Sequence, residues 1–216
     1  MGGRGSTSYS SSSKSLPKGA GGLVSTNAGD YAGMSQEAIM EGLSKLDYEV
    51  AALFNSRGEL IGITTDGKSG EVTASPSVLG SLRYAKDHPE ENGPMTHFHN
   101  HPINERTQGI FSSNDIGIYA NAAVAHDAGA GGQPVKNVVK TSDGRTYTLE
   151  YVGGGRKKLA GFKNAYAYEE RKAAARASTS KSKSLSGKIS SADNHLTKWL
   201  SSNAASYGFR FSHSKG

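Results

Sequence analysis

The 216-residue chain contains no cysteine. This absence excludes disulfide bonds and thiolate metal sites, so any metal site must use histidine and carboxylate ligands. Long apolar runs are missing as well, because no stretch approaches the roughly 20 residues that a helix needs to cross a bilayer. The N-terminal residues have no apolar core, so we expect neither a signal peptide nor a membrane partner.

Apolar residues are scarce, at 35% of the chain, while glycine is frequent, with 28 residues. The shortfall lies mainly in two segments, residues 1–31 and 178–188, which are rich in Gly, Ser, Thr, Lys and Ala. Such segments bury too little apolar surface to order themselves. We therefore expect a disordered leader over 1–31, a packed domain over 32–155, a basic helix with a Ser/Lys linker over 156–188, and a short amphipathic helix with a tail over 189–216.

Negative charge is nearly absent from the segment 156–188. It contains ten Lys or Arg residues against Glu169 and Glu170, a net charge of +8. Because the whole chain carries +6, the remainder carries −2. A segment of this charge can contact nucleic acid non-specifically, or an acidic partner. The alternative is a solvated helix face followed by a linker.

Apolar periodicity predicts a chain that alternates between helices and strands. Ser35 can cap a helix that carries Ile39 and Leu43 on one face, and the Asp143-Gly144 turn predicts a hairpin. The other predicted elements are strands at 49–54, 59–65, 95–101, 136–140 and 146–152, and helices at 76–86, 112–128, 157–177 and 191–206. This order predicts a mixed, layered α/β domain.

Histidines occupy alternate positions, 97, 99 and 101, in the predicted strand 95–101. Side chains two residues apart in a strand point to the same face, so the imidazoles converge. Two imidazoles and one nearby carboxylate form a three-ligand metal site with an open fourth position, which is the layout of a catalytic zinc. His99 and His101 are the best candidates. His97 is either a further site residue or, as we expect, a neutral histidine that lines the site.

The candidate third ligand is Asp115, in the pattern Ser112-x-x-Asp115. Its carboxylate can reach the imidazoles if the first helical turn packs beneath the end of the strand. The same spacing is also that of a capping box, in which Ser and Asp only stabilise the start of a helix. Both interpretations can hold together. The remaining histidines (His88, His126, His195 and His213) are expected to be exposed and structural.

His99-Asn-His101-Pro102 followed by Ser112-x-x-Asp115 resembles the motif of the JAB/JAMM (MPN-type) metallohydrolases, and His-Asn-His-Pro reads as it does in the RadC-type proteins. The family has a glutamate opening an upstream strand, and Glu49-Val-Ala-Ala-Leu-Phe54 is similar to that pattern. Glu59 and Glu71 match it less well. The alternative for Glu49 is a surface carboxylate at a strand edge. The resemblance covers about residues 35–152.

The resemblance implies a cytidine-deaminase-like α-β-α sandwich with a mixed sheet. It also implies that His99, His101 and Asp115 bind Zn²⁺, that Glu49 is the general base towards a metal-activated water, and that Ser112 steadies the oxyanion. The implied activity is hydrolysis of an amide bond in a protein or peptide substrate. Ten residues separate His101 from Ser112, more than in many family members. The resemblance therefore does not indicate that this chain acts on the same substrates as the family.

A second, weaker resemblance is to JAB-like proteins of bacteriophages and prophages. It rests on Met1-Gly-Gly-Arg-Gly-Ser6, on Phe-Ser-x-x-Asp-Ile116 and on Tyr207-Gly-Phe-Arg210. It implies a protein of the host cytoplasm or of the virion, with phage structural proteins as partners. The alternative hypotheses are therefore a virion or assembly protein that uses the fold as a non-catalytic binding module, and, by analogy of fold alone, a nucleic-acid-processing protein.

Overall fold

A mixed six-stranded sheet forms the centre of the protein. The computed structural model describes residues 15–68, 83–84, 87–88, 91, 93–103, 109–181 and 184–215. In this part of the chain the strand order is β2-β1-β3-β4-β5-β6. The strands are β1 (Ala51–Phe54), β2 (Leu60–Thr64), β3 (Met95–His101), β4 (Pro134–Thr141), β5 (Thr146–Tyr151) and β6 (Phe209–Ser214).

The strand β3 lies near the centre of the sheet, between an antiparallel neighbour, β1, and a parallel neighbour, β4. The helix α4 (Ser113–Asp127) follows β3 along the chain and precedes β4. Parallel neighbours need a crossover of this kind, and the crossover helix packs on a face of the sheet. The start of α4 therefore lies close to the end of β3, as the sequence analysis required.

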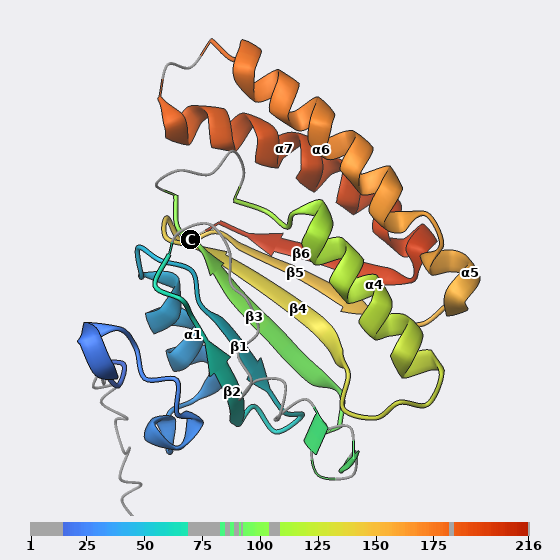
Figure 1. Ribbon diagram of the computed structural model, residues 1–216. Coiled ribbons are helices and arrows are strands. Elements are labelled where there is room, and N and C mark those ends of the chain that lie inside the picture. Colours follow the sequence, from blue (N-terminus) through green and yellow to red (C-terminus); the bar gives the residue numbers. More distant parts are fainter. Residues whose placement is uncertain are drawn as a thin grey trace, which may run out of the picture.

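Helices cover both faces of the sheet (Figure 1), and an apolar cluster lies on each face. One includes Phe98 and Val138 with the helix α1 (Gln36–Ser44). The other includes Val139 with α4 and the C-terminal helices α5 (Gly155–Leu159), α6 (Phe162–Thr179) and α7 (Leu185–Asn203). His99 pairs with Val139 across the β3–β4 register, so its side chain belongs to the α4 face.

The predicted elements of the central region are confirmed. Ser35 caps α1, and Ser112 caps α4 in a full capping box. The hairpin β4–β5 forms around Asp143-Gly144, where Gly144 has a φ of 89° that favours glycine. The predicted helix at 76–86 and Glu71 lie outside the described residues, apart from the helical residues 83–84. The general α/β class is therefore confirmed.

Residues 15–31, which were predicted to be part of a disordered leader, are folded onto the domain. Residues 15–31 include the short 3-10 helices η1 (Ala20–Gly22) and η2 (Ala28–Tyr31), and residues 1–14 lie outside the described part. Val24 and Tyr31 are each only 2% exposed and join the apolar cluster around α1. Tyr31 also donates a hydrogen bond to the Ser25 carbonyl at 2.8 Å. Two apolar side chains within a polar sequence are sufficient to hold this segment, which composition alone did not indicate.

The C-terminal region is not a separate arm. Phe162 and Tyr166 of α6 are fully buried, α7 packs along α6, and β6 pairs with β5. The predicted helix at 157–177 is divided into α5 and α6 at Gly161, which has a left-handed φ of 81°. The helix predicted at 191–206 begins earlier, because Ser184 caps α7 through the amide of Gly187. The packed domain therefore extends to β6 instead of ending at 155.

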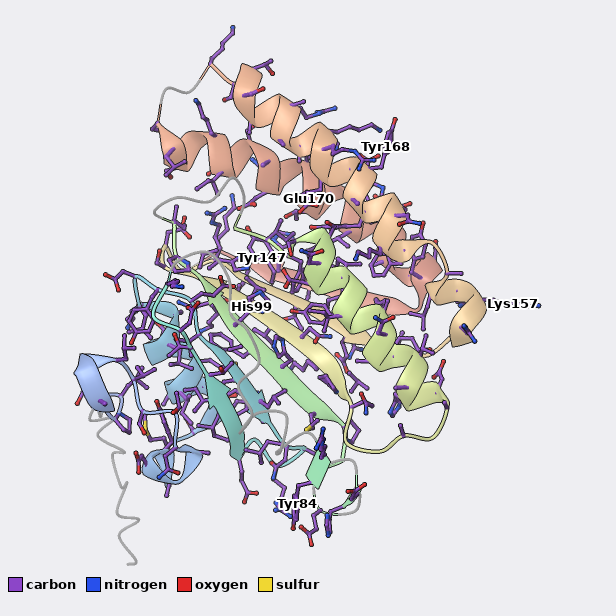
Figure 2. All side chains as sticks on the ribbon, viewed as in Figure 1. Tyr84, His99, Tyr147, Lys157, Tyr168 and Glu170 are labelled. Atoms are coloured by element: carbon purple, nitrogen blue, oxygen red, sulfur yellow. The ribbon has the colours of Figure 1, made fainter. Side chains whose placement is uncertain are left out.

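The outer surfaces of α5 and α6 carry exposed basic side chains. Figure 2 shows Lys157 of α5 and Tyr168 of α6 pointing outwards, whereas His99, which is 3% exposed, lies at the central sheet. The helices of the described residues include none that combines the length and apolar character needed to cross a membrane.

Candidate metal centre

The α4 face of β3 carries the three histidines. His99 and His101 are 3% and 1% exposed, and His97 is partly buried beside them. The alternation of β3 turns the intervening Phe98 and Asn100 to the opposite face, where Phe98 joins the apolar cluster around α1. The strand thus separates imidazoles from apolar packing by its period of two.

The two imidazoles nearest the end of β3 converge on one point. The Nε2 atoms of His99 and His101 lie 3.0 Å apart, and the ring centroids 4.7 Å. Two nitrogen ligands at zinc distances of 2.0–2.1 Å in tetrahedral geometry are about 3.3 Å apart. The observed separation is therefore close to that of two ligands of one metal ion.

Each of these rings has a polar contact at its other nitrogen. His101 Nδ1 donates a hydrogen bond to the Gly109 carbonyl at 3.0 Å, and a carbonyl can only accept. The proton is therefore on Nδ1, and in the neutral ring Nε2 presents a lone pair to His99. His99 Nδ1 lies 3.3 Å from the hydroxyl of Tyr119 on α4. Contacts of this kind orient histidine ligands in metal sites.

Asp115 approaches His99 from the first turn of α4. Its Oδ2 lies 3.6 Å from His99 Nε2, and it accepts hydrogen bonds from the Ser112 amide (2.7 Å) and hydroxyl (2.8 Å). Burial raises the pKa of Asp115, but the contact with His99 and the hydrogen bonds outweigh burial and lower it overall. The capping box and the approach to the imidazole therefore coexist, since the cap fixes the turn that carries Asp115.

Glu49 is buried, at 5% exposure, instead of lying at a strand edge on the surface. It lies two residues before β1, where its amide donates to the Lys68 carbonyl at 2.9 Å and its carbonyl accepts from Thr65 Oγ1 at 2.7 Å. Its Oε1 lies 4.0 Å from His101 Nε2. Glu59 instead pairs with Arg57 at 2.8 Å on the surface, away from this group.

Glu49, His99 and His101 form a buried group whose ligand atoms all lie within 4.8 Å of one another. This group could hold a metal ion, and its nitrogen and oxygen donors fit zinc in a protein without cysteine. Asp115 lies beside the group, next to His99. The structure therefore brings together all four charged or imidazole residues that the sequence singled out, and Ser112 with them.

His97 contacts the same region but differs in its surroundings. Burial, with a smaller contribution from His99, lowers its pKa to about 3. Its Nδ1 lies 3.4 Å from the hydroxyl of Tyr119. Of the other histidines, all predicted to be exposed, His126 and His213 are exposed. The prediction is wrong for His88 and His195, which are partly buried, and His195 contacts Glu169 at 2.7 Å. His97 is therefore a neutral neighbour of the two converging rings, as the sequence analysis expected.

Asn100 and Tyr119 were given no role by the sequence analysis, yet both shape the site. Asn100 is fully buried on the α1 face, where its Oδ1 accepts from the Val50 amide at 2.7 Å and its Nδ2 donates to the Tyr48 carbonyl at 2.9 Å. These bonds fix β3 against the segment that carries Glu49. The signal for Asn100 was its place between two candidate ligands. Tyr119 carried no comparable signal.

Comparison of the chain with protein-family models, with curated proteins and with solved structures finds no significant match in any of the three. The resemblance to the JAB/JAMM metallohydrolases thus stays a prediction from the motif. The geometry of the buried group does not depend on that resemblance.

Proposed function

We propose that the protein is a zinc-dependent amide-bond hydrolase of JAB/JAMM type, acting as a peptidase or isopeptidase. The observation that carries the proposal is the convergence of two buried imidazole nitrogens, 3.0 Å apart, with carboxylates of two other chain segments within 4.0 Å. A group of this composition inside a protein is costly unless it binds a cation or a proton. It is also the composition of three-ligand catalytic zinc sites.

In this proposal His99, His101 and Asp115 hold the metal. Zinc bound there would supply Lewis acidity, lowering the pKa of a water molecule and polarising the substrate carbonyl. Glu49 removes the proton from the attacking water and returns it to the departing amine, as general base and then general acid. Ser112 donates a hydrogen bond to the developing oxyanion. In the structure its hydroxyl donates to Asp115, so the hydroxyl must rotate away from Asp115 to take this role.

Metal content and turnover of three variants test these roles. Wild-type protein reconstituted with Zn²⁺ is expected to hold one equivalent by elemental analysis and to cleave fluorogenic peptide or Nε-lysyl isopeptide substrates. Glu49→Gln should keep zinc and lose turnover, whereas His101→Ala should lose both. Replacing the exposed His213 with Ala serves as the matched control and should change neither. Wild-type protein without stoichiometric zinc would overturn the proposal.

Glu49 and Asp115 compete for the third ligand position, because Glu49 belongs to the compact group and Asp115 only adjoins it. The variant that loses zinc shows which of the two carboxylates is the ligand. If Asp115→Asn loses zinc while Glu49→Gln retains it, Asp115 is the ligand and Glu49 the base. The reverse outcome would exchange the two assignments and contradict the mechanism above.

A second candidate function rests on the exposed charge of α5 and α6. The exposed basic side chains on these helices are Arg156, Lys157, Lys158, Lys163, Arg171, Lys172 and Arg176. They favour a binding module, such as a phage virion or assembly protein of the host cytoplasm or the virion, that contacts nucleic acid through phosphates. Binding to DNA that weakens steeply with salt and persists in Glu49→Gln would support this function. Binding that is absent or insensitive to salt would contradict it.

A further inference from the structure

A buried carboxylate on α7 lies next to the metal centre, although its residue is outside the metal-binding motif. Asp193 is 2% exposed. Its Oδ1 accepts hydrogen bonds from the backbone amides of Gly109 (2.8 Å) and Ile110 (3.2 Å). These amides belong to the segment between β3 and α4, more than 80 residues earlier in the chain. Asp193 therefore fixes the backbone just before the helix that carries Asp115.

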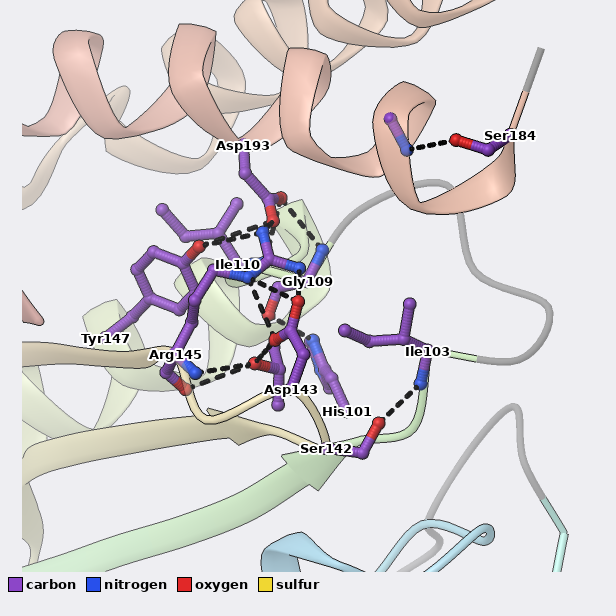
Figure 3. Close-up of polar contacts among 12 residues, drawn as sticks. His101, Ile103, Gly109, Ile110, Ser142, Asp143, Arg145, Tyr147, Ser184 and Asp193 are labelled. Carbon is purple, nitrogen blue, oxygen red and sulfur yellow. Dashed lines mark hydrogen bonds and ion pairs between the residues drawn. The ribbon is translucent and has the colours of Figure 1, made fainter. Parts of the chain in front are cut away.

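The same stretch of backbone holds a histidine of the metal centre. The Gly109 carbonyl accepts the hydrogen bond from His101 Nδ1 at 3.0 Å. The amide and the carbonyl of Gly109 are thus held from opposite sides, one by Asp193 and the other by His101. Figure 3 shows this sequence of contacts from α7 through Gly109 to the end of β3. The position of the carbonyl decides where the His101 ring can place its Nε2.

Gly109 is closely enclosed by the groups that hold it. A Cβ atom added at this position would meet Thr141 Cγ2 at 2.8 Å and Asp193 Oδ2 at 2.9 Å. Such approaches are shorter than van der Waals contact, so any larger residue must displace one of these neighbours. The backbone at Gly109, which holds the His101 ring, is therefore closely packed and has little room to move.

Asp193 is itself held by groups of the β4–β5 hairpin. Its Oδ2 forms an ion pair with the guanidinium of Arg145 and accepts from the Tyr147 hydroxyl at 3.3 Å. Arg145 also pairs with Asp143 at 2.9 Å. Two rigid elements, α7 and the hairpin, thus fix the carboxylate that holds Gly109.

We infer that Asp193 is a positioning residue for the metal ligand His101, acting through the backbone of Gly109 to set the tautomer and the orientation of the imidazole. The inference rests on the proposed function for the identity of the metal. It extends the site to α7, beyond the region in which the motif lies. Asp193 touches neither the metal position nor any substrate, so its effect is on the affinity and geometry of the site.

The variant Asp193→Asn tests the inference. It keeps the shape of the side chain and removes the negative charge that pairs with Arg145 and holds the Gly109 amide. We expect zinc affinity, measured by competition with a chromophoric chelator, to fall by about tenfold, as for other residues that orient metal ligands. The visible spectrum of the Co²⁺-loaded protein should change as well. The matched control is Glu169→Gln, which removes another buried carboxylate between α6 and α7 but does not contact Gly109. It should leave both readouts unchanged.

The imidazole N–H signal of His101 gives a readout without metal. In the metal-free wild type, the Nδ1–H held by Gly109 should give an observable proton resonance, which Asp193→Asn should lose and Glu169→Gln should keep. If wild-type protein binds no zinc, the proposed function fails while this measurement still decides the inference. If zinc binds and Asp193→Asn changes neither its affinity nor the Nδ1–H signal, the inference is overturned and Asp193 only closes the loop.

A second variant covers the case in which Asp193→Asn does not fold. Gly109→Ala leaves every charge in place and pushes against Asp193 and Thr141, so it should reduce zinc affinity in a protein with a native far-ultraviolet spectrum. Native zinc affinity in folded Gly109→Ala would contradict the inference in the same way.

Discussion

Two buried polar clusters lie on the α4 face of the sheet, and they differ in the origin of their positive charge. The first joins Asp193 to Arg145, whose guanidinium is permanently charged and supplies the cation from within the chain. The second joins Glu49 and Asp115 to His99 and His101. Its four side chains are two carboxylates and two imidazoles, which are groups of the kind that bind zinc. The first cluster contains its own cation, whereas the second could hold a metal ion.

The largest expected effect comes from breaking the cluster that supplies its own cation. Arg145→Met leaves the Asp193 carboxylate buried without its ion-pair partner, and removing one partner of a buried pair costs about 3–5 kcal/mol. The free energy of unfolding, measured by urea titration, should fall by this amount. Arg145→Met combined with Asp193→Asn should recover part of the loss, because the remaining side chain is neutral. A loss below about 1 kcal/mol for Arg145→Met would contradict the comparison.

The second effect comes from supplying the cation to the other cluster. Zinc at about 100 times its dissociation constant should raise the free energy of unfolding by about 2.7 kcal/mol, because it binds the folded chain. His99→Ala should abolish this gain. His213→Ala removes an exposed histidine of β6 and should retain it. Equal stabilisation of wild type and His99→Ala would show that zinc binds elsewhere.

A smaller effect is expected at Asn100, which supports the histidine cluster from the opposite face of β3. Asn100→Ala leaves the Val50 amide and the Tyr48 carbonyl without the partners described above. An unmet buried hydrogen bond costs about 1–3 kcal/mol, and we expect a loss of stability in this range by urea titration. Asn27→Ala, at an exposed turn, provides the comparison and should cost less.

The smallest effect concerns pH and the contact between α6 and α7. Burial alone would raise the pKa of Glu169, but the hydrogen bonds from Lys172 and His195 outweigh it and lower the pKa below its ordinary value. The stability that this carboxylate adds is therefore present at neutral pH and lost as pH falls below the ordinary range of a glutamate. Wild type should lose more stability than Glu169→Gln on acidification from pH 6 to 3, by at most about 1 kcal/mol. An identical pH dependence would contradict this assignment.

The parts of the site that follow from local sequence were predicted well. Alternation along β3 places His99 and His101 on one face, and the Ser112-x-x-Asp115 spacing specifies a capped helix that starts next to them. Both depend on residues fewer than 20 positions apart, so backbone geometry alone relates them. The approach of Glu49 followed only from the resemblance, because no local rule states which strand pairs with β3.

The remaining features depend on long-range packing and could not be predicted from the sequence. The polar segment 15–31 is held by Val24 and Tyr31, which gain their stabilisation only where α1 and β1 already stand. The apolar side of α6 consists of alanines and two aromatic residues, and only the packing of Phe162 and Tyr166 against α7 makes it part of the core. Asp193 resembles any helical aspartate until the fold brings Gly109 to it.

The strand β6 and the helices α5, α6 and α7 before it follow the residues of the candidate metal centre in the chain. β6 pairs only with β5, on the outer side of the sheet, and Phe209 at its start closes the apolar cluster over Phe162. A nascent chain that has emerged as far as Tyr151 already contains every residue of the candidate metal centre, but none of α5, α6, α7 or β6. The imidazoles of β3 therefore leave the ribosome before the elements that enclose their face of the sheet.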